Sequence, residues 1–452
     1  MAQHTPDDHL ASAERAWRWV LDQVRRDDGP WIPWHVDGDA TLRPPWDRDG
    51  MHSGVGGLAH ALAEIRLLRT WSGEERDLAQ GIADRVRRAV PGEQDCSFFD
   101  GLVSHLGVLT ALGDPGGAAT AVTRLLAVAG PAGWPMRPLE DERIGAGATS
   151  NDLTLGTAGV LLGALWGLRK GVPGSLDLAD RAAGILLAEA EQEEVGLTWR
   201  MVPPRHVDGP SGEMPNLSHG VAGVATALAL AGCELERPDL LAAAEAGAAH
   251  LVSLADQVTP GLTVPCTIRP RPREDDGPAF GWCHGSAGTS LLFLALQRAG
   301  TAEVAARPPL VWHRRCLYAV RHSGVPARVS PGFWDNDGRC CGTAGVGEVF
   351  LDAWQREGRA VDLGFAVRLA DALLERAVHD GPHTYWRFVE HRAADPLLPP
   401  GVGWMQGAAG IAAHLFRVGR VLREGSGAAT VARMDNWWAV GREPPPASVT
   451  RT

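Results

Sequence analysis

The chain has 452 residues, a formal net charge of −11 at pH 7 and 45% hydrophobic residues, enough apolar sequence for a large core. Its acidic balance and the lack of Lys/Arg clusters argue against a nucleic-acid surface. Apolar stretches are too short to span a bilayer, and residues 1–15 are polar rather than signal-like. We therefore expect a cytoplasmic protein with no integral membrane segment.

A short glycine-rich phrase recurs seven times along the chain. One copy reads Leu155-Gly156-Thr157-Ala158-Gly159, and the second copy is degenerate. The first glycines of the seven phrases, which lie 47 to 65 residues apart, are Gly54, Gly101, Gly156, Gly220, Gly285, Gly342 and Gly407. This spacing fits two helices and their loops in each repeat.

The segments after these glycines are apolar on nearly every side, which is typical of buried helices. They include residues 160–168, 224–231, 291–296, 346–354 and 411–418. Segments with one apolar stripe, typical of covering helices, lie at residues 176–192, 240–257 and 361–378. The pattern predicts an all-α fold, an α/α toroid (barrel) of seven inner and seven outer helices. We place this single domain at residues 1–423, and expect a short terminal helix and a loose tail over 424–452.

The seven cysteines divide into two groups. In a chain without a secretion signal, a disulfide framework is the weaker explanation for them. Four are predicted to be inert small hydrophobic residues: Cys96, Cys233, Cys266 and Cys316. The others directly precede repeat glycines: Cys283 lies before His284-Gly285, and Cys340-Cys341 lies before Gly342.

These three cysteines predict a metal site at one level of the ring. Soft thiolates suit zinc, which binds sulfur at about 2.3 Å in a tetrahedral shell. Three protein thiolates would leave the fourth position for water or substrate, as in catalytic zinc sites. The sequence thus predicts one Zn²⁺ per chain, bound by Cys283, Cys340 and Cys341. A strained vicinal disulfide at Cys340-Cys341 and buried free thiols are the alternatives.

The phrases Gly281-Trp282-Cys283-His284-Gly285 and Cys340-Cys341-Gly342 resemble motifs of the lanthionine synthetase C-like cyclases of lanthipeptide biosynthesis. The similarity covers the repeat phrases between about residue 50 and residue 415. It implies an α/α barrel of seven helices within seven and a single zinc that binds a cysteine thiol of a dehydrated precursor peptide. The bound thiolate would add to dehydroalanine or dehydrobutyrine and close a thioether ring.

The same resemblance implies that Cys283, Cys340 and Cys341 are the metal ligands, and that His219 and Asp152 are acid/base residues. The chemistry is consistent with these roles, because thiol addition leaves an enolate that a histidine can protonate near neutral pH. Asp152 would accept the thiol proton or orient His219, with a helix N-cap as its alternative role.

The sequence departs from the family pattern at two places. Cys341 stands where many members have histidine, so three protein thiolates would give the zinc centre a net charge of −1 before substrate binds. Residues 279–282 lack an arginine that some members place there, and we expect Arg271 or Arg273 as possible substitutes. The resemblance favours a non-ligand role for His284, and His52 is predicted to be a core or surface residue.

Several functions remain open for such a scaffold. A prenyltransferase-like role fits poorly, because it needs mixed Asp, Cys and His ligands and a basic diphosphate pocket. An enzyme that adds glutathione or another small thiol to dehydroamino acids is one alternative, and a non-catalytic, zinc-stabilised peptide-binding ring is another. The chain has no room for a dehydrating domain, so a cyclase would need a separate dehydratase or kinase/lyase to supply its peptide.

Overall fold

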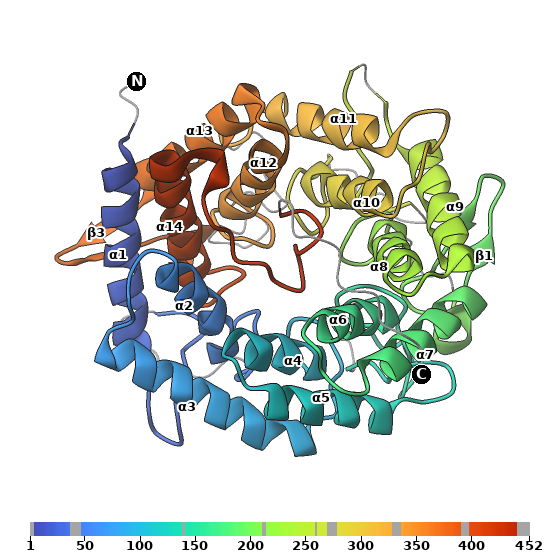
Figure 1. Ribbon diagram of the computed structural model, residues 1–452, viewed down its shortest axis with the longest axis horizontal. Coiled ribbons are helices and arrows are strands. Elements are labelled where there is room, and N and C mark those ends of the chain that lie inside the picture. Colours follow the sequence, from blue (N-terminus) through green and yellow to red (C-terminus); the bar gives the residue numbers. More distant parts are fainter. Residues whose placement is uncertain are drawn as a thin grey trace.

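The computed structural model describes residues 4–36, 47–137, 141–209, 214–257, 260–268, 278–327, 336–389 and 397–440. Within these residues fourteen α-helices form a ring of two concentric layers, which confirms the predicted toroid (Figure 1). The inner helices are α2 (Leu58–Arg66), α4 (Leu102–Ala111), α6 (Thr157–Arg169), α8 (Val221–Glu234), α10 (Ser286–Arg298), α12 (Thr343–Glu357) and α14 (Ala408–Glu424). The outer helices are α1 (Pro6–Gln23), α3 (Gly73–Ala89), α5 (Pro115–Val128), α7 (Ser175–Ala188), α9 (Pro238–Leu254), α11 (Pro309–Arg321) and α13 (Ala360–Arg376).

The inner helices are buried on every side, as their composition predicts. In α8, every residue from Val221 to Gly232 is buried. Glycine allows the backbones to approach closely at the start of such a helix, since a Cβ atom on Gly223 would lie 2.0 Å from the carbonyl oxygen of Leu217. The outer helix α7 instead buries a stripe at helical spacing, including Leu178, Ala182 and Leu186.

The outer helices end two to four residues earlier than predicted. Helix α7 ends at Ala188 rather than at residue 192, because Glu191–Gln192 forms strand β1, which pairs with β2 (Leu197–Thr198). The other short hairpins are β3 (Val378–Asp380) with β4 (His383–Tyr385), and β5 (Arg387–Val389) with β6 (Leu397–Pro400). Short 3-10 helices lie at Val55–Gly57, Val90–Gly92, Pro204–His206 and Gly425–Gly427. None of the described helices combines the length and apolar character needed to cross a membrane.

The ring is closed by contacts between its first and last repeats. The N-terminal helix α1 packs against α14, and so supplies the outer helix of the last repeat. Backbone hydrogen bonds also close the ring, and they join the residues that lie two positions before each repeat glycine. Met405 N donates to His52 O (3.0 Å), Cys340 N donates to Met405 O (2.9 Å), and Cys283 N donates to Cys340 O (3.1 Å).

The same pattern continues around the rest of the ring. Ser218 N donates to Cys283 O (3.0 Å), Thr154 N to Ser218 O (3.2 Å), Phe98 N to Thr154 O (2.8 Å), and His52 N to Phe99 O (3.0 Å). We call this closed circle of backbone hydrogen bonds the belt. Its members are His52, Phe99, Thr154, Ser218, Cys283, Cys340 and Met405, and in the second repeat the donor is Phe98, the residue before Phe99. The belt holds the side chains of all seven repeats at one level, beside the N-termini of the inner helices.

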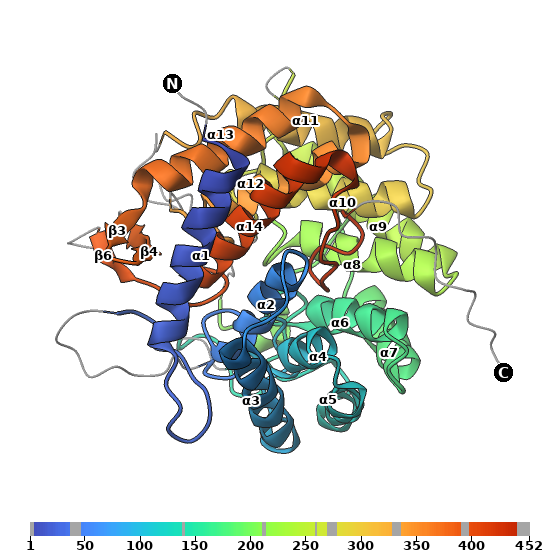
Figure 2. The ribbon, with the colours of Figure 1, turned by 60° about the vertical axis from the view of Figure 1, so that its left-hand side comes forward.

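The described residues after α14 return to the interior of the ring (Figures 1 and 2). The side chains of Met434 and Trp437 are almost completely buried. The Trp437 ring lies 4.4 Å from the guanidinium of Arg169 and 5.1 Å from that of Arg298, residues that end α6 and α10. Residues 428–440 are therefore packed where a loose tail was expected, at the C-terminal ends of the inner helices. Residues 441–452 lie outside the described part, and the domain boundary at residue 423 remains a prediction.

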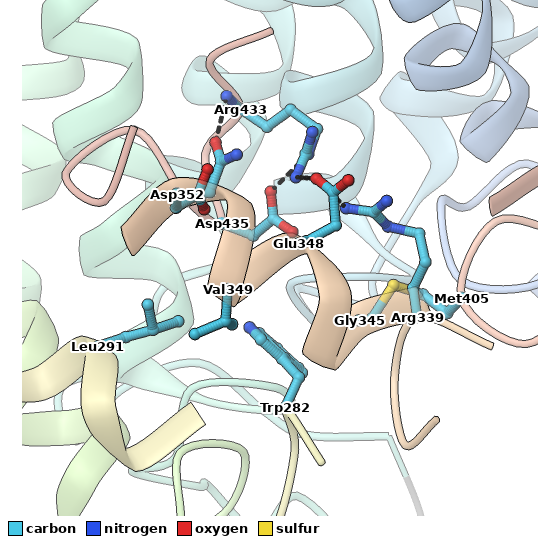
Figure 3. A pocket seen from close by; sticks show the side chains of 11 residues that line it. Trp282, Leu291, Arg339, Gly345, Glu348, Val349, Asp352, Met405, Arg433 and Asp435 are labelled. Carbon is cyan, nitrogen blue, oxygen red and sulfur yellow. Dashed lines mark hydrogen bonds and ion pairs between the residues drawn. The ribbon is translucent and has the colours of Figure 1, made fainter. Parts of the chain in front are cut away.

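Buried ion pairs connect this C-terminal segment to the ring. Glu348 of α12 lies 2.9 Å from Arg417 of α14. It also lies 3.3 Å from Arg339 and 3.7 Å from Arg433 (Figure 3). Burial would raise the pKa of Glu348, but the charges of Arg417 and Arg339 outweigh it and hold this pKa well below its usual range. Removing one partner from such a buried network leaves an uncompensated charge. The network therefore specifies how the C-terminal segment sits inside the ring.

His60 on α2 makes the stability of the ring sensitive to acid. Burial lowers the pKa of His60 to about 3, and the charges of Arg433 and Arg339 act in the same direction. An unfolded histidine has a pKa of about 6.5. Below that pH the unfolded chain binds a proton at this residue, whereas the folded chain does not. Stability should therefore fall with decreasing pH, and this residue alone contributes a loss of about 3 kcal/mol between pH 6.5 and 4.

This prediction can be checked with the midpoints of urea unfolding at about pH 4 and about pH 7. The difference between the two midpoints should be smaller for His60→Gln than for the unmodified protein. Equal differences in the two proteins would contradict the assignment.

Candidate active site

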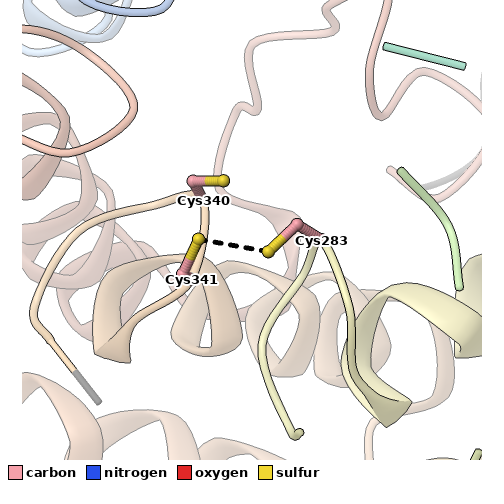
Figure 4. A group of neighbouring side chains, drawn as sticks. All are labelled: Cys283, Cys340 and Cys341. Carbon is pink, nitrogen blue, oxygen red and sulfur yellow. Dashed lines mark hydrogen bonds between the residues drawn. The ribbon is translucent and has the colours of Figure 1, made fainter. Parts of the chain in front are cut away.

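The three predicted metal ligands come together at the belt, to which Cys283 and Cys340 belong and Cys341 is adjacent. Cys283 lies just before α10, and Cys340 and Cys341 lie just before α12 (Figure 4). Their Sγ atoms all lie within 4.8 Å of one another, and Cys283 Sγ is 3.1 Å from Cys341 Sγ. Tetrahedral zinc with Zn–S bonds of about 2.3 Å places two sulfurs about 3.8 Å apart. Small side-chain rotations would therefore let all three sulfurs contact one ion, so the residues fit the predicted metal.

The protonation of the cluster also favours a bound cation. The cysteines are free in the structure, rather than joined as a vicinal disulfide. Burial raises the pKa of Cys283 and of Cys341, whereas hydrogen bonds with these two thiols lower the pKa of Cys340. Three buried thiolates need a cation to compensate their charge, which couples metal binding to the release of protons.

The predicted acid/base residues form a pair. His219 Nδ1 lies 2.5 Å from Asp152 Oδ2 and 2.9 Å from Thr154 Oγ1. Asp152 is fully buried, and its other oxygen accepts the Leu155 backbone N–H at 2.7 Å. The N-cap residue of α6 is Gly156, so Asp152 does not have the alternative role of helix cap. Asp152 therefore contacts Nδ1 of the His219 ring, and not Nε2.

The pair and the cysteine cluster are neighbours along the belt. Ser218, the residue before His219, donates its backbone N–H to the carbonyl oxygen of Cys283 at 3.0 Å. The ring of His284, the residue after Cys283, lies 5.5 Å from the ring of His219. Among the described residues, the sulfur atoms of the three cysteines lie within 4.8 Å of one another, and this group of possible metal ligands does not include His284. This arrangement fits the predicted non-ligand role of His284.

Sequence reasoning missed His52, which we expected to be a core or surface residue. His52 lies two positions before Gly54, the same offset that Cys283 and Cys340 have from their own repeat glycines. Burial would lower the pKa of His52, but the interaction with Cys340 and the charge of Asp100 outweigh burial and raise the pKa to about 9. The common offset is the signal that could have identified it.

A small cavity lies against the C-terminal segment. It is lined by Trp282 and Arg339, the residues before Cys283 and Cys340, and by Arg433 of the C-terminal segment (Figure 3). Trp282 and Trp404 are buried and pack in the hydrophobic core. Trp334, Arg271 and Arg273 lie outside the described residues, so the missing arginine has no assigned substitute.

Comparison with known proteins identifies the family. A family model described as "Lanthionine synthetase C-like protein" matches residues 45–419, more than half of the chain. No curated protein matches the sequence significantly. Among solved structures, "Nisin cyclase" is similar with a TM-score of 0.55 and 15% identity, over 83% of this chain and 89% of that chain.

A second solved structure, the cellobiose 2-epimerase from Spirochaeta thermophila DSM 6192, has a TM-score of 0.48 and 13% identity, over 93% of this chain and 97% of that chain. At these identities the structural likeness concerns the fold alone. The family model, however, spans the repeats that carry the three cysteines and the His219–Asp152 pair. The chain therefore belongs to the lanthionine synthetase C-like proteins.

Proposed function

We propose that the protein is a zinc-dependent peptide cyclase. Its substrate would be a dehydrated precursor peptide, in which a cysteine thiol adds to dehydroalanine or dehydrobutyrine to form a lanthionine or methyllanthionine ring. The observation that carries this proposal is the placement of a three-cysteine cluster and a His219–Asp152 pair next to neighbouring members of the belt. Membership of the family and the likeness to nisin cyclase support it.

The metal's part in this chemistry is to hold a thiol as a thiolate near neutral pH. Cys283, Cys340 and Cys341 would hold one zinc per chain and leave its fourth position to the substrate sulfur. Four sulfurs would bring the charge of the centre to −2, one unit more negative than with a histidine in place of Cys341. This charge makes the substrate sulfur a better nucleophile, at some loss of Lewis acidity.

His219 would complete the addition. Attack of the substrate sulfur on the β carbon forms the C–S bond and moves the alkene electron pair to the α carbon, as an enolate. His219 donates a proton from Nε2 to that carbon, while Asp152 holds Nδ1 and fixes the direction of the ring. The proton lost by the substrate thiol equals the proton gained at the α carbon, so the reaction needs no oxidant, reductant or net acid.

The proposed reaction also implies partners. The alkene of the substrate must be made beforehand by loss of water from serine or threonine, so we propose a separate dehydratase or kinase/lyase in the same compartment. We propose that this compartment is the cytoplasm. The free thiols in the described part of the chain are compatible with this assignment.

An incubation with two dehydrated peptides tests the proposal. The first peptide carries a cysteine, and the second lacks cysteine but is mixed with glutathione. A cyclase should leave the mass of the first peptide unchanged while removing its ability to react with a thiol alkylator, and should leave the second peptide unmodified.

The alternatives give different results in the same experiment. Addition of one glutathione to the second peptide would favour a small-thiol transferase that uses the same site. If neither peptide reacts but both bind, the protein is a peptide-binding ring and the proposal is wrong.

A further inference from the structure

We infer that the C-terminal segment, residues 428–440, positions the turn that carries Cys340 and Cys341, and hence the metal that these cysteines would bind. The segment acts on the turn through its one arginine, Arg433. The inference deepens the proposed function, and rests on it only in taking the cysteines as metal ligands. It gives the part of the chain that follows α14 a role in the site.

The turn is tied by its backbone to the last repeat. It comprises residues 336–342 and ends where α12 begins. Arg339 and Cys340 both donate their backbone N–H groups to the carbonyl oxygen of Met405, at 2.8 and 2.9 Å. These bonds hold the turn at the level of the belt. Because Arg339 directly precedes Cys340, the way in which its side chain is held also sets the direction of the cysteines.

The side chain of Arg339 is locked in the interior of the ring. It is 5% exposed, and its Nη2 donates to Glu348 Oε2 at 3.3 Å. Its guanidinium lies 4.2 Å from the centre of the Trp404 ring, and a Cβ atom on Gly410 would lie 2.8 Å from its Cδ. A buried charge of this kind is stable only while its partners are in place. Displacing these partners would therefore move Arg339 and, with it, the turn.

Arg433 of the C-terminal segment contacts the same two partners. Its Nη2 lies 3.7 Å from Glu348 Oε2 (Figure 3). Its guanidinium lies 5.4 Å from the centre of the Trp404 ring. The segment itself holds Arg433, since Asp435 Oδ1 accepts its Nε–H at 3.0 Å. Glu348 and Trp404 thus contact both arginines, and they connect the segment to the turn.

The segment also reaches the helix that follows Cys283. Trp438 donates its Nε1–H to the carbonyl oxygen of Leu291 on α10, at 3.1 Å. The small cavity against the segment is lined by Trp282 and Arg339, the residues that precede the two ligand positions. The segment therefore packs against the supports of the cysteines in both repeats.

Replacing Arg433 tests the inference through metal affinity. In Arg433→Met the turn should sample several conformations, and only a fraction of them presents both sulfurs to the metal. Affinity falls in proportion to that fraction, so we expect the dissociation constant of zinc to rise about 2- to 30-fold. Competition with a chromophoric chelator measures this constant.

A milder variant keeps the inference testable if Arg433→Met does not fold. Arg433→Lys keeps the charge but loses the flat group that contacts Glu348 and Trp404 together. It should weaken zinc binding in the same direction.

Two buried glutamates provide a matched comparison. Glu348→Gln breaks the connection, whereas Glu75→Gln neutralises a buried glutamate of α3 that pairs with Arg69 at 2.8 Å. Helix α3 lies on the other side of the ring from α12 (Figure 1). Glu348→Gln should weaken zinc binding as Arg433→Met does. Glu75→Gln should lower the midpoint of urea unfolding and leave zinc affinity unchanged.

Alkylation of the metal-free protein gives a second readout. The rates at Cys340, Cys341 and Cys316 are followed by the masses of the digested peptides. Cys316 is completely buried in α11, so its rate reports opening of the whole ring. Arg433→Met should accelerate alkylation at Cys340 and Cys341 more than at Cys316, because the turn is loosened locally.

Three results would overturn the inference. They are unmodified zinc affinity in folded Arg433→Met and Arg433→Lys, an equal loss of affinity in Glu348→Gln and Glu75→Gln, and equal acceleration of alkylation at all three cysteines. The last two would show that the segment contributes to overall stability alone. If zinc affinity depends on Arg433 but no peptide is cyclised, the proposed function fails and the positioning role stands. If peptides are cyclised and Arg433 has no effect on zinc affinity, the positioning role alone fails.

Discussion

Replacing Cys283, Cys340 or Cys341 by alanine is expected to abolish stoichiometric zinc binding. The unmodified protein should contain one zinc per chain. Each substitution leaves only two sulfurs within 4.8 Å of each other, whereas zinc sites in proteins have at least three protein ligands. Elemental analysis of the purified, dialysed variants measures this loss directly, and circular dichroism shows whether the ring still folds.

Two other cysteines provide matched controls. Cys316 is completely buried in α11 and Cys233 is exposed on α8, and both are distant in sequence from the repeat glycines that precede α10 and α12. Cys316→Ala reproduces the loss of a buried sulfur, and Cys233→Ala reproduces the loss of an exposed one. Both should retain one zinc per chain. Full zinc content in Cys340→Ala would show that the ligand assignment is wrong.

Replacing His219 by alanine should slow ring closure by about a hundred-fold or more, while zinc and peptide remain bound. The reason is that the enolate would lose its positioned proton donor, although the thiolate would still form. Single-turnover reactions with a dehydrated peptide, stopped with a thiol alkylator and analysed by mass, would reveal the uncyclised cysteine. An unchanged rate would remove His219 from the chemistry and leave it as a packing residue.

Asp152 can be separated from His219 by a double-mutant cycle. Asp152→Asn should slow the reaction less steeply than His219→Ala if Asp152 acts only by holding Nδ1. In that case, Asp152→Asn should have no further effect in the His219→Ala background. A further loss in the double variant would instead indicate that Asp152 takes part in proton transfer on its own.

The repeat architecture was predictable because its physical causes are local. A glycine at the head of a helix and an apolar sequence after it are visible in any one repeat, and their sevenfold recurrence indicates a ring. The ends of the outer helices were not predictable to the residue. Helix α7 stops at Ala188 because Glu191 pairs with Thr198, a contact that the apolar stripe of the helix does not encode.

The candidate site was predictable where a residue of a metal-binding type also lies two positions before a repeat glycine. Cys283 and Cys340 combine a soft ligand with a position before a glycine, and the structure brings them together. His52 has the same offset but lies in the first repeat, and its neighbour on the belt, Met405, belongs to the last. The packed C-terminal segment was missed because Arg433 and Trp437 are held by distant ion pairs and ring contacts, which leave no periodicity in the sequence.

Closure of the belt between His52 and Met405 has a consequence for biosynthesis. In an open solenoid, each repeat is stabilised by its neighbours, so a partial chain can fold as the ribosome extends it. In this ring the first repeat has no partner on one side until Met405 and α14 have emerged. The thiols of Cys283, Cys340 and Cys341 all emerge earlier, and so pass through a stage in which the nascent chain cannot yet complete the circle around them. We therefore expect the proposed metal centre to reach its native surroundings only after translation of the seventh repeat.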